Sequence, residues 1–361
     1  MTDVAIIGGG ASGLASAVMI RQRCPSAAVT VFERNSRVGK KLSVTGNGRC
    51  NITNRLLAEE RYHGDPRFAF RLLKDFGYDR QQEFFRHLGV LFTEEDGGKV
   101  YPMSLQAASV TDALRLTAEE LGVRLTTDCT VTGVRRNGNG FTVTSSEGVM
   151  DTAAVVIACG GKAGGRLGSQ SGYDLLRQLG HKITPLFPAI VQLRTDPGIV
   201  RSLKGVKTDG TVTVVSENGS RTDFGEILFT DYGISGPPVL QVSRLAEGPG
   251  ARAELDLLPG MTEEEIVSHL SGVIAGHPGR LASEIFDGFI NKRLGSVALK
   301  QSGVSLSLKA AQIPETVVRN CAAFLKHLSL NVLGTTGFDN AQITAGGADT
   351  AQFFEDRKSV V

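Results

Sequence analysis

The clearest hydrophobic pattern lies at the start of the chain, where two short apolar runs flank a helical repeat. Residues 3–7 (DVAII) form a short apolar run, as expected of a buried strand. Residues 14–23 have apolar positions at helical spacing, and residues 28–33 (AVTVFE) form a second strand that ends in an acid. The order strand, helix, strand predicts a βαβ unit with a parallel sheet.

Similar patterns predict the later elements. Residues 153–158 are continuously apolar, which predicts a central strand of the parallel sheet. Thr262 is expected to cap a helix, because Glu265 stands at capping-box distance. Further helices are expected at 66–76, 80–88, 107–121, 173–179, 237–245, 262–270, 283–290 and 314–328. From about residue 188 the expected strands become short and separated, at 191–193, 212–215, 226–230 and 253–257.

Composition and charge narrow the class of protein. A chain of 361 residues suggests about two domains, and 41% hydrophobic residues exclude a mainly disordered chain. The net charge of +2 gives no overall attraction to nucleic acid or to an anionic membrane. The five cysteines form no CxxC pair, so we predict neither a metal site nor a disulfide framework. No apolar stretch is long enough to cross a membrane, and we expect a cytoplasmic protein.

The glycines between the first strand and helix form a dinucleotide-binding motif. Gly8, Gly10 and Gly13 give the spacing GxGxxG, and Glu33 ends the second strand about 20 residues later. The first glycine of such a motif permits a tight turn, the second admits a pyrophosphate, and the third lets the helix pack closely on the strand. The start of the helix binds the anion, and the acid accepts hydrogen bonds from ribose hydroxyls.

The segment that follows differs from a plain NAD-binding domain. Residues 39–54 (GKKLSVTGNGRCNITN) combine basic side chains, glycines and amide donors, as a loop over a dinucleotide requires. This segment and residues 155–181, 225–244 and 337–347 resemble the BaiN/RdsA-like (YhiN-type) FAD-dependent oxidoreductases over essentially the whole chain. The resemblance implies an α/β fold, in which a Rossmann-like FAD-binding domain of the two-dinucleotide-binding flavoprotein type carries an inserted α+β domain.

The resemblance also implies domain boundaries and cofactor contacts. We expect the FAD-binding domain at 1–187, the inserted substrate or cap domain at 188–335 and a return at 336–355. Family members continue beyond this point, so we expect the native protein to be longer and residues 356–361 to be a non-native tail. The implied FAD contacts are Gly8, Gly10, Ala11, Ser12, Gly13, Glu33, Arg34, Lys41, Leu42, Gly48, Arg49, Cys50, Asn51, Val131, Ala158, Gly160 and Gly161.

The implied chemistry is flavin-dependent reduction of an activated C=C bond. NAD(P)H is the expected electron donor and would visit transiently, because the chain holds no second complete GxGxxG unit. Family members have been linked to bile-acid-type dehydro-steroids and, in another branch, to uridine of ribosomal RNA, which they convert to dihydrouridine. A small-molecule reductase, an RNA-modifying flavoenzyme and a non-catalytic flavin-binding protein therefore remain as alternatives. The basic residues that could contact RNA are Arg194, Arg201, Lys204 and Lys207.

Reduction of a C=C bond also needs a proton donor. Cys50 is the first candidate, with a buried packing residue as the alternative. Tyr232 and Asp231 are the second candidates, and a simple turn in the loop is the alternative there. Arg49 is expected to offset negative charge on the reduced flavin.

Overall fold

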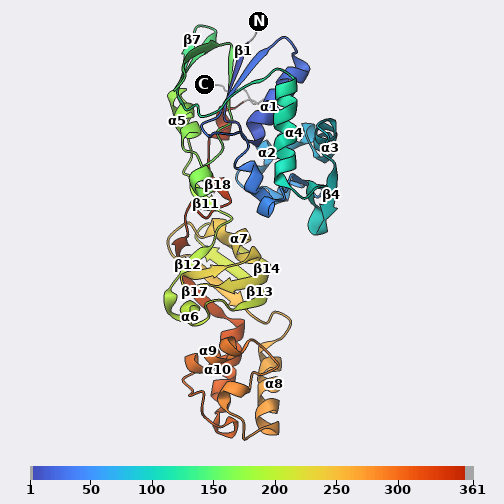
Figure 1. Cartoon of the computed structure of the whole chain (residues 1–361). Helices are drawn as coiled ribbons and strands as arrows, with labels where there is room; N and C mark the ends of the chain where they lie inside the picture. Colours follow the sequence, from blue (N-terminus) through green and yellow to red (C-terminus); the bar gives the residue numbers. More distant parts are fainter. Residues whose placement is uncertain (1–2, 354–361) are drawn as a thin grey trace. The chain divides into compact units, whose positions relative to one another are not determined.

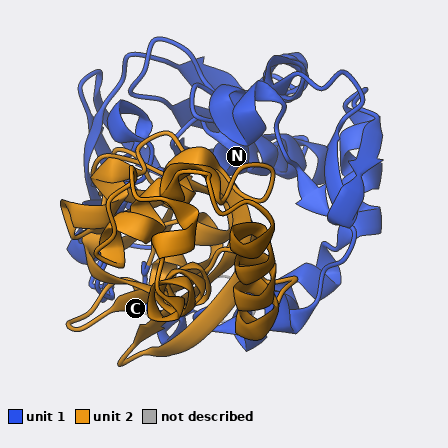
Figure 2. Ribbon diagram, turned by 90° about the horizontal axis from the view of Figure 1, so that it is seen from below, with its two compact units in different colours: residues 1–186, 346–361 blue, residues 187–345 orange. Residues whose placement is uncertain are grey.

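The structure is a computed structural model that describes residues 3–353, and these form two compact units (Figures 1 and 2). Unit 1 takes residues 3–186 and 346–353 of the described chain, and unit 2 takes residues 187–345. The expected tail at 356–361 lies outside the described residues. Among the helices of the described part, none combines the length and hydrophobicity that crossing a bilayer requires.

A parallel sheet forms the centre of unit 1, with the strand order β10-β1-β2-β6. Its strands are β1 (Asp3–Ile7), β2 (Ala28–Phe32), β6 (Arg124–Thr126) and β10 (Ala154–Ile157). The prediction that residues 153–158 form a central strand is wrong, because β10 lies at an edge of this sheet. The run is apolar throughout because its two faces contact different cores. Ala154 and Val156 pack on one core, and Val155 and Ile157 pack on the other.

Different layers cover the two faces of this sheet (Figure 1). On one face, α1 (Ala11–Arg23) and α4 (Ala107–Glu120) contribute Ala17, Val18 and Ala118 to a shared core. On the other face lie an antiparallel sheet and α5 (Ser171–Gln178), which share a core that includes Val134 and Leu175. The strands of the antiparallel sheet are β7 (Val131–Asn137), β8 (Gly140–Ser145) and β9 (Gly148–Thr152).

A smaller layer of unit 1 follows the first βαβ unit. The 3-10 segment η1 (Leu42–Gly48) leads into an antiparallel sheet of order β3-β5-β4. Its strands are β3 (Thr53–Asn54), β4 (Phe92–Glu95) and β5 (Lys99–Pro102). The helices α2 (Pro66–Asp75) and α3 (Tyr78–His87) lie between β3 and β4 in the sequence.

Unit 2 is built on a closed barrel of order β12-β15-β14-β13-β16-β17. The strands are β12 (Leu193–Thr195), β13 (Lys207–Ser216), β14 (Gly219–Phe229), β15 (Gly233–Ser235), β16 (Arg252–Asp256) and β17 (Leu328–Thr335). The helices are α6 (Pro197–Ser202), α7 (Pro237–Val242), α8 (Glu263–Gly276), α9 (Lys292–Gln301) and α10 (Glu315–Lys326). Within this unit, α8, α9 and α10 lie together beyond one end of the barrel (Figure 1), and their apolar residues join the barrel core.

Two sequence predictions for unit 2 are corrected. The helix expected at 283–290 is a short 3-10 turn, η6 (Ala282–Glu284), followed by turns that include Gly288 at a φ of +82°. The return expected at 336 does not occur there. Instead, β18 (Ile343–Ala345) pairs antiparallel with β11 (Phe187–Ala189), and this pairing keeps residues 336–345 in unit 2.

Candidate active site

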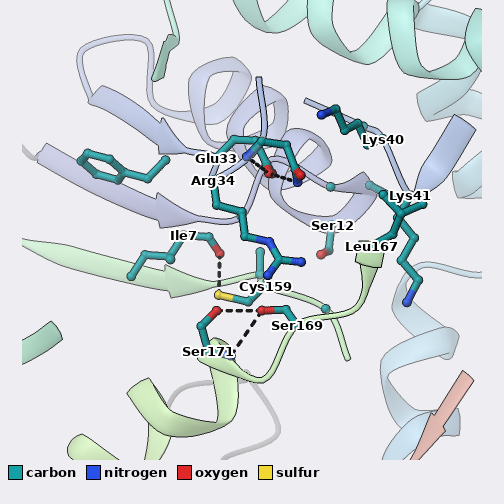
Figure 3. A pocket seen from close by; sticks show the side chains of 18 of the residues that line it. Ile7, Ser12, Glu33, Arg34, Lys40, Lys41, Cys159, Leu167, Ser169 and Ser171 are labelled. Atoms are coloured by element: carbon teal, nitrogen blue, oxygen red, sulfur yellow. Dashed lines mark hydrogen bonds between the residues drawn. The ribbon is translucent and has the colours of Figure 1, made fainter. Parts of the chain in front are cut away.

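A cavity of about 380 Å³ lies in unit 1 at the carboxyl ends of β1, β2 and β10 (Figure 3). This is the edge at which parallel α/β sheets bind ligands, and the volume falls within the usual range for ligand sites. The cavity is lined by Ile7, Gly8, Gly10, Ala11, Ser12, Phe32, Glu33, Arg34, Asn35, Gly39, Lys40, Lys41, Leu42, Thr45, Cys129, Thr130, Val131, Ala158, Cys159, Gly160, Leu167, Ser169 and Ser171.

The three motif glycines meet different surroundings. Gly8 has a φ of +112°, and an added Cβ would lie 2.4 Å from the carbonyl oxygen of Ala158. A Cβ on Gly13 would lie 1.8 Å from the carbonyl oxygen of Gly8, so α1 packs directly on the turn before it. A Cβ on Gly10 would meet nothing within 4 Å and would enter open space. The turn is therefore accessible to a ligand at Gly10 and closely packed at Gly8 and Gly13.

The start of α1 is suited to an anion. Gly10 is the N-cap residue and supplies no side-chain acceptor to the first turn, and that turn contains no acid. The unpaired N–H groups at a helix start and the helix dipole both favour a bound anion. Arg34, Lys40 and Lys41 add positive side chains to the same cavity. The residues present therefore fit the pyrophosphate of a dinucleotide such as FAD.

Glu33 is buried and held in place by the loop around it. Its Oε2 accepts a 2.9 Å hydrogen bond from Gly9 N, and its Oε1 accepts from Asn35 N and Asn35 Nδ2. An ionised carboxylate has about four acceptor positions. Three of them are filled by these groups, which leaves capacity for about one hydroxyl donor. Glu33 can therefore accept from a ribose, but it also fixes the glycine turn.

Two basic side chains tie the glycine-rich segment 160–169 to the loop after β2. Lys41 Nζ donates a 2.6 Å hydrogen bond to the carbonyl of Ala163, and Arg34 Nη2 donates to the carbonyl of Gly168. Burial lowers the pKa of Lys41. Figure 3 shows Arg34 reaching across the cavity toward the segment that carries Leu167 and Ser169. These contacts give both cations a structural role as well as a position in the cavity.

The structure brings most of the expected cofactor residues to the cavity, but not all. Those in its lining are Gly8, Gly10, Ala11, Ser12, Glu33, Arg34, Lys41, Leu42, Val131, Ala158 and Gly160. Those outside its lining are Gly13, Gly48, Arg49, Cys50, Asn51 and Gly161. Sequence reasoning missed lining residues such as Lys40, Thr130 and Cys159, although each is a direct neighbour of an expected residue. Ser169 and Ser171 also line the cavity, but neither is next to an expected cofactor residue, so the sequence did not indicate them.

The loop that carries Arg49 and Cys50 has a strained backbone. Gly46, Asn47, Gly48 and Cys50 all have positive φ values, and +60° at Cys50 is unusual for a residue with a side chain. Cys50 is only 3% exposed and belongs to a hydrophobic core with Leu14. Burial raises the pKa of its thiol, so the thiol stays protonated. These contacts favour the packing alternative for Cys50.

Arg49 has partners other than a flavin in this structure. Its Nη1 lies 2.7 Å from Glu95 Oε1, and its guanidinium carbon lies 4.4 Å from the centre of the Tyr101 ring. Glu95 therefore already compensates the charge that we expected to act on the reduced flavin.

The other candidate proton donors lie in unit 2, in the turn between β14 and β15. Lys204 Nζ lies 2.8 Å from Asp231 Oδ2, and this hydrogen bond and charge lower the pKa of the Asp231 carboxyl. This pair favours the ionised form of Asp231, which makes Tyr232 the better of the two candidates for an acid. Tyr232 is 37% exposed.

Comparison with known proteins places the chain in a family. The family model described as the HI0933-like protein Rossmann domain matches residues 2–357. A 3-dehydro-bile acid delta(4,6)-reductase from Clostridium scindens is 37% identical over 99% of this chain and 89% of that protein. Ribosomal RNA dihydrouridine synthases are more distant. The one from Escherichia coli is 28% identical over 96% of this chain and 86% of that protein, and the one from Haemophilus influenzae is 26% identical over 96% and 85%.

These matches confirm the predicted resemblance to the BaiN/RdsA-like proteins and the predicted fold class. They also favour an enzyme over the non-catalytic flavin-binding alternative. The chain therefore belongs to the HI0933-like Rossmann family and is an FAD-dependent oxidoreductase.

Proposed function

We propose that this protein is a reductase that saturates an activated C=C bond in a small conjugated ketone of the bile-acid type, with NAD(P)H as its electron donor. The observation that supports this most is the 37% identity to the Clostridium scindens reductase over almost the whole chain. When bound, FAD would supply hydride transfer from NAD(P)H to one alkene carbon, with NAD(P)⁺ as the oxidised product and a proton added to the neighbouring carbon.

The residues of unit 1 would hold the cofactor. The open space at Gly10 and the start of α1 would bind the pyrophosphate, and Glu33 would accept from the ribose. Val131 lines the cavity and would present its backbone to the adenine. Gly48, Arg49, Cys50 and Asn51 lie outside the lining of this cavity and would contact the part of the cofactor that extends beyond it.

Tyr232 is the proton donor that we propose. The exposed phenol is accessible to a substrate, whereas Asp231 is ionised and Cys50 is enclosed by apolar side chains. A phenol O–H is a hydrogen-bond donor and can release its proton to a substrate carbon. Tyr232 would place this proton on the carbon next to the one that receives the hydride.

The RNA-modifying function is the second candidate, supported by the two dihydrouridine synthases among the relatives. Lys204 and Lys207 of unit 2 would be available to RNA only in part, because each pairs with a carboxylate at 2.8 Å. Arg194 and Arg201 remain as further candidates. This charge compensation favours the small molecule. The cytoplasmic location stays a prediction.

The test supplies the FAD-loaded protein with NADPH or NADH and either a Δ4-3-oxo bile acid or deproteinised ribosomal RNA. We expect nicotinamide oxidation to match the loss of enone absorbance, with no dihydrouridine in the RNA. Dihydrouridine formation that falls steeply with salt would support the second candidate instead. Turnover of neither substrate would contradict both.

A matched pair of variants tests the proton donor. Tyr232→Phe should slow substrate reduction by about 10²- to 10⁴-fold without changing reduction of the flavin by NAD(P)H. Cys50→Ala should instead lower stability and leave the chemical step unchanged in the folded fraction. The reverse result would assign the proton to Cys50.

A further inference from the structure

Unit 2 contains an arginine, Arg244, whose Nε atom is buried. Arg244 belongs to the 3-10 turn η5 (Ser243–Leu245), at the end of the family-specific segment 225–244. Its Nε is shielded from solvent, and within residues 3–353 this atom has no hydrogen-bond partner. A buried N–H group without a partner costs free energy, so native proteins rarely keep one.

The backbone around Arg244 is held firmly. Ser243 is fully buried, and its Oγ donates a 2.7 Å hydrogen bond to the carbonyl of Leu240 and accepts from Val191 N at 3.3 Å. After the turn, Asn218 Nδ2 donates to the carbonyl of Glu247 at 3.2 Å. Arg244 therefore starts from a fixed turn, and a loose backbone does not explain why its Nε finds no acceptor among the described residues.

A second positive charge lies nearby. Arg221 lies on β14 between the exposed Ser220 and Thr222. Because successive residues of a strand point to opposite faces, Arg221 lies on the same face as the buried Ile227. Burial and then the charge of Arg221 both lower the pKa of Arg244. An anion that binds beside Arg244 would therefore be attracted by two positive charges.

We propose that Arg244 and Arg221 form an anion-binding site in unit 2 that takes a carboxylate or a phosphate group. A guanidinium presents a planar fork of N–H donors that matches both groups, and the buried Nε–H of Arg244 would gain its missing acceptor. The site lies in the barrel unit, away from the glycine motif in sequence, and its existence does not depend on the proposed reaction.

Calorimetric titration of the whole chain with inorganic phosphate and with acetate tests this proposal. Chloride keeps the ionic strength constant. We expect at least one of the two anions to bind, and Arg244→Met to weaken binding at least tenfold. Arg244→Lys, which keeps the charge but loses the fork, should have intermediate affinity. A preference for phosphate would indicate a phosphorylated ligand, and a preference for acetate a carboxylic acid.

The control variant is Arg252→Met, which removes an exposed arginine from β16 and should leave anion binding unchanged. Unit 1 can also attract phosphate through its glycine motif, so the comparison between variants, not the total heat, assigns the site. Wild-type affinity in Arg244→Met, or no binding of either anion to the wild-type chain, would overturn the proposal.

Thermal unfolding separates this role from a purely structural one. In chloride alone, Arg244→Met should raise the melting temperature, because it removes a buried N–H donor that has no acceptor among the described residues. Phosphate or acetate should raise the melting temperature of the wild-type chain and not that of this variant. A structural arginine would give the opposite result, with Arg244→Met less stable and its response to anions retained.

Discussion

Gly10 and Gly13 lie in the same motif but should respond differently to a single methyl group. A Cβ on Gly13 would lie 1.8 Å from the carbonyl oxygen of Gly8, so Gly13→Ala must separate α1 from the turn. We expect this variant to lose about 1–3 kcal/mol of unfolding free energy. A Cβ on Gly10 meets nothing within 4 Å, so Gly10→Ala should fold nearly normally but weaken FAD binding by about tenfold or more.

Urea unfolding of the unliganded protein and titration of flavin fluorescence measure the two effects separately. The pair serves as its own control, because each variant adds one methyl group to the same turn. Equal stability of the two variants would show that the close contact at Gly13 is not rigid. Unchanged FAD affinity in Gly10→Ala would show that the pyrophosphate does not approach this glycine.

The sequence predicted one role of Glu33, ribose binding, but not its second role of fixing the glycine turn. Its distance from the glycines indicated a ribose-binding acid, because that spacing follows from the length of one helix and one strand. The hydrogen bonds from Gly9 and Asn35 could not be predicted, since they depend on side-chain rotamers and on the path of the loop. Arg49 shows the same limit, because its partner Glu95 lies in a separate strand.

At the scale of elements, the segment 160–169 depends on its contact with Lys41. The 2.6 Å hydrogen bond from Lys41 Nζ to Ala163 O holds a stretch that contains several glycines and little regular structure. We expect Lys41→Met to speed amide hydrogen exchange across 160–169 by about tenfold, the effect of losing roughly one charged hydrogen bond.

Lys40→Met is the matched control for this experiment. Lys40 lines the same cavity, but its Nζ bonds to Ser36 Oγ at 3.1 Å, within its own loop. Its removal should leave exchange across 160–169 unchanged while lowering the positive charge near the cavity equally. If both variants speed exchange to the same extent, the segment responds to charge and not to the hydrogen bond.

Elements with local signals were predicted well, and those that need distant partners were not. The capping box of Thr262 and Glu265 begins α8 as expected, because both of its hydrogen bonds lie within one turn. α9 was missed, since Gly295 interrupts its helical pattern. The structure explains this glycine, because an added Cβ would lie 2.6 Å from the Phe286 ring. The close contact with Phe286 is tertiary and leaves no trace in the sequence.

At the scale of the whole chain, the same contrast separates the two units. The first βαβ unit of unit 1 was predictable, because one helix joins its two parallel strands and the glycine motif marks this crossover. The barrel of unit 2 was expected only as a set of short strands, since β12 pairs with β17 across more than a hundred residues. Its closure depends on which distant strands pair, and an alternating pattern within one strand does not specify the partner strand.

The two ends of unit 2 allow a test of how independent unit 1 is. β11 and β18 are antiparallel partners, with Phe187 opposite Ala345, so the insert leaves and rejoins unit 1 at neighbouring positions. Paired residues of antiparallel strands have Cα atoms about 5 Å apart, a gap that about three glycine or serine residues can bridge. We expect a chain in which such a linker replaces residues 187–345 to fold, and to bind FAD within about tenfold of the parent affinity.

This spliced chain should not reduce the substrate, because it lacks Tyr232 and the rest of the barrel. Flavin fluorescence and NAD(P)H oxidation measure both properties, and residues 187–345 expressed alone should unfold cooperatively. Loss of FAD binding in a folded spliced chain would show that the barrel contributes directly to the cofactor site, and substrate turnover by that chain would place the proton donor in unit 1.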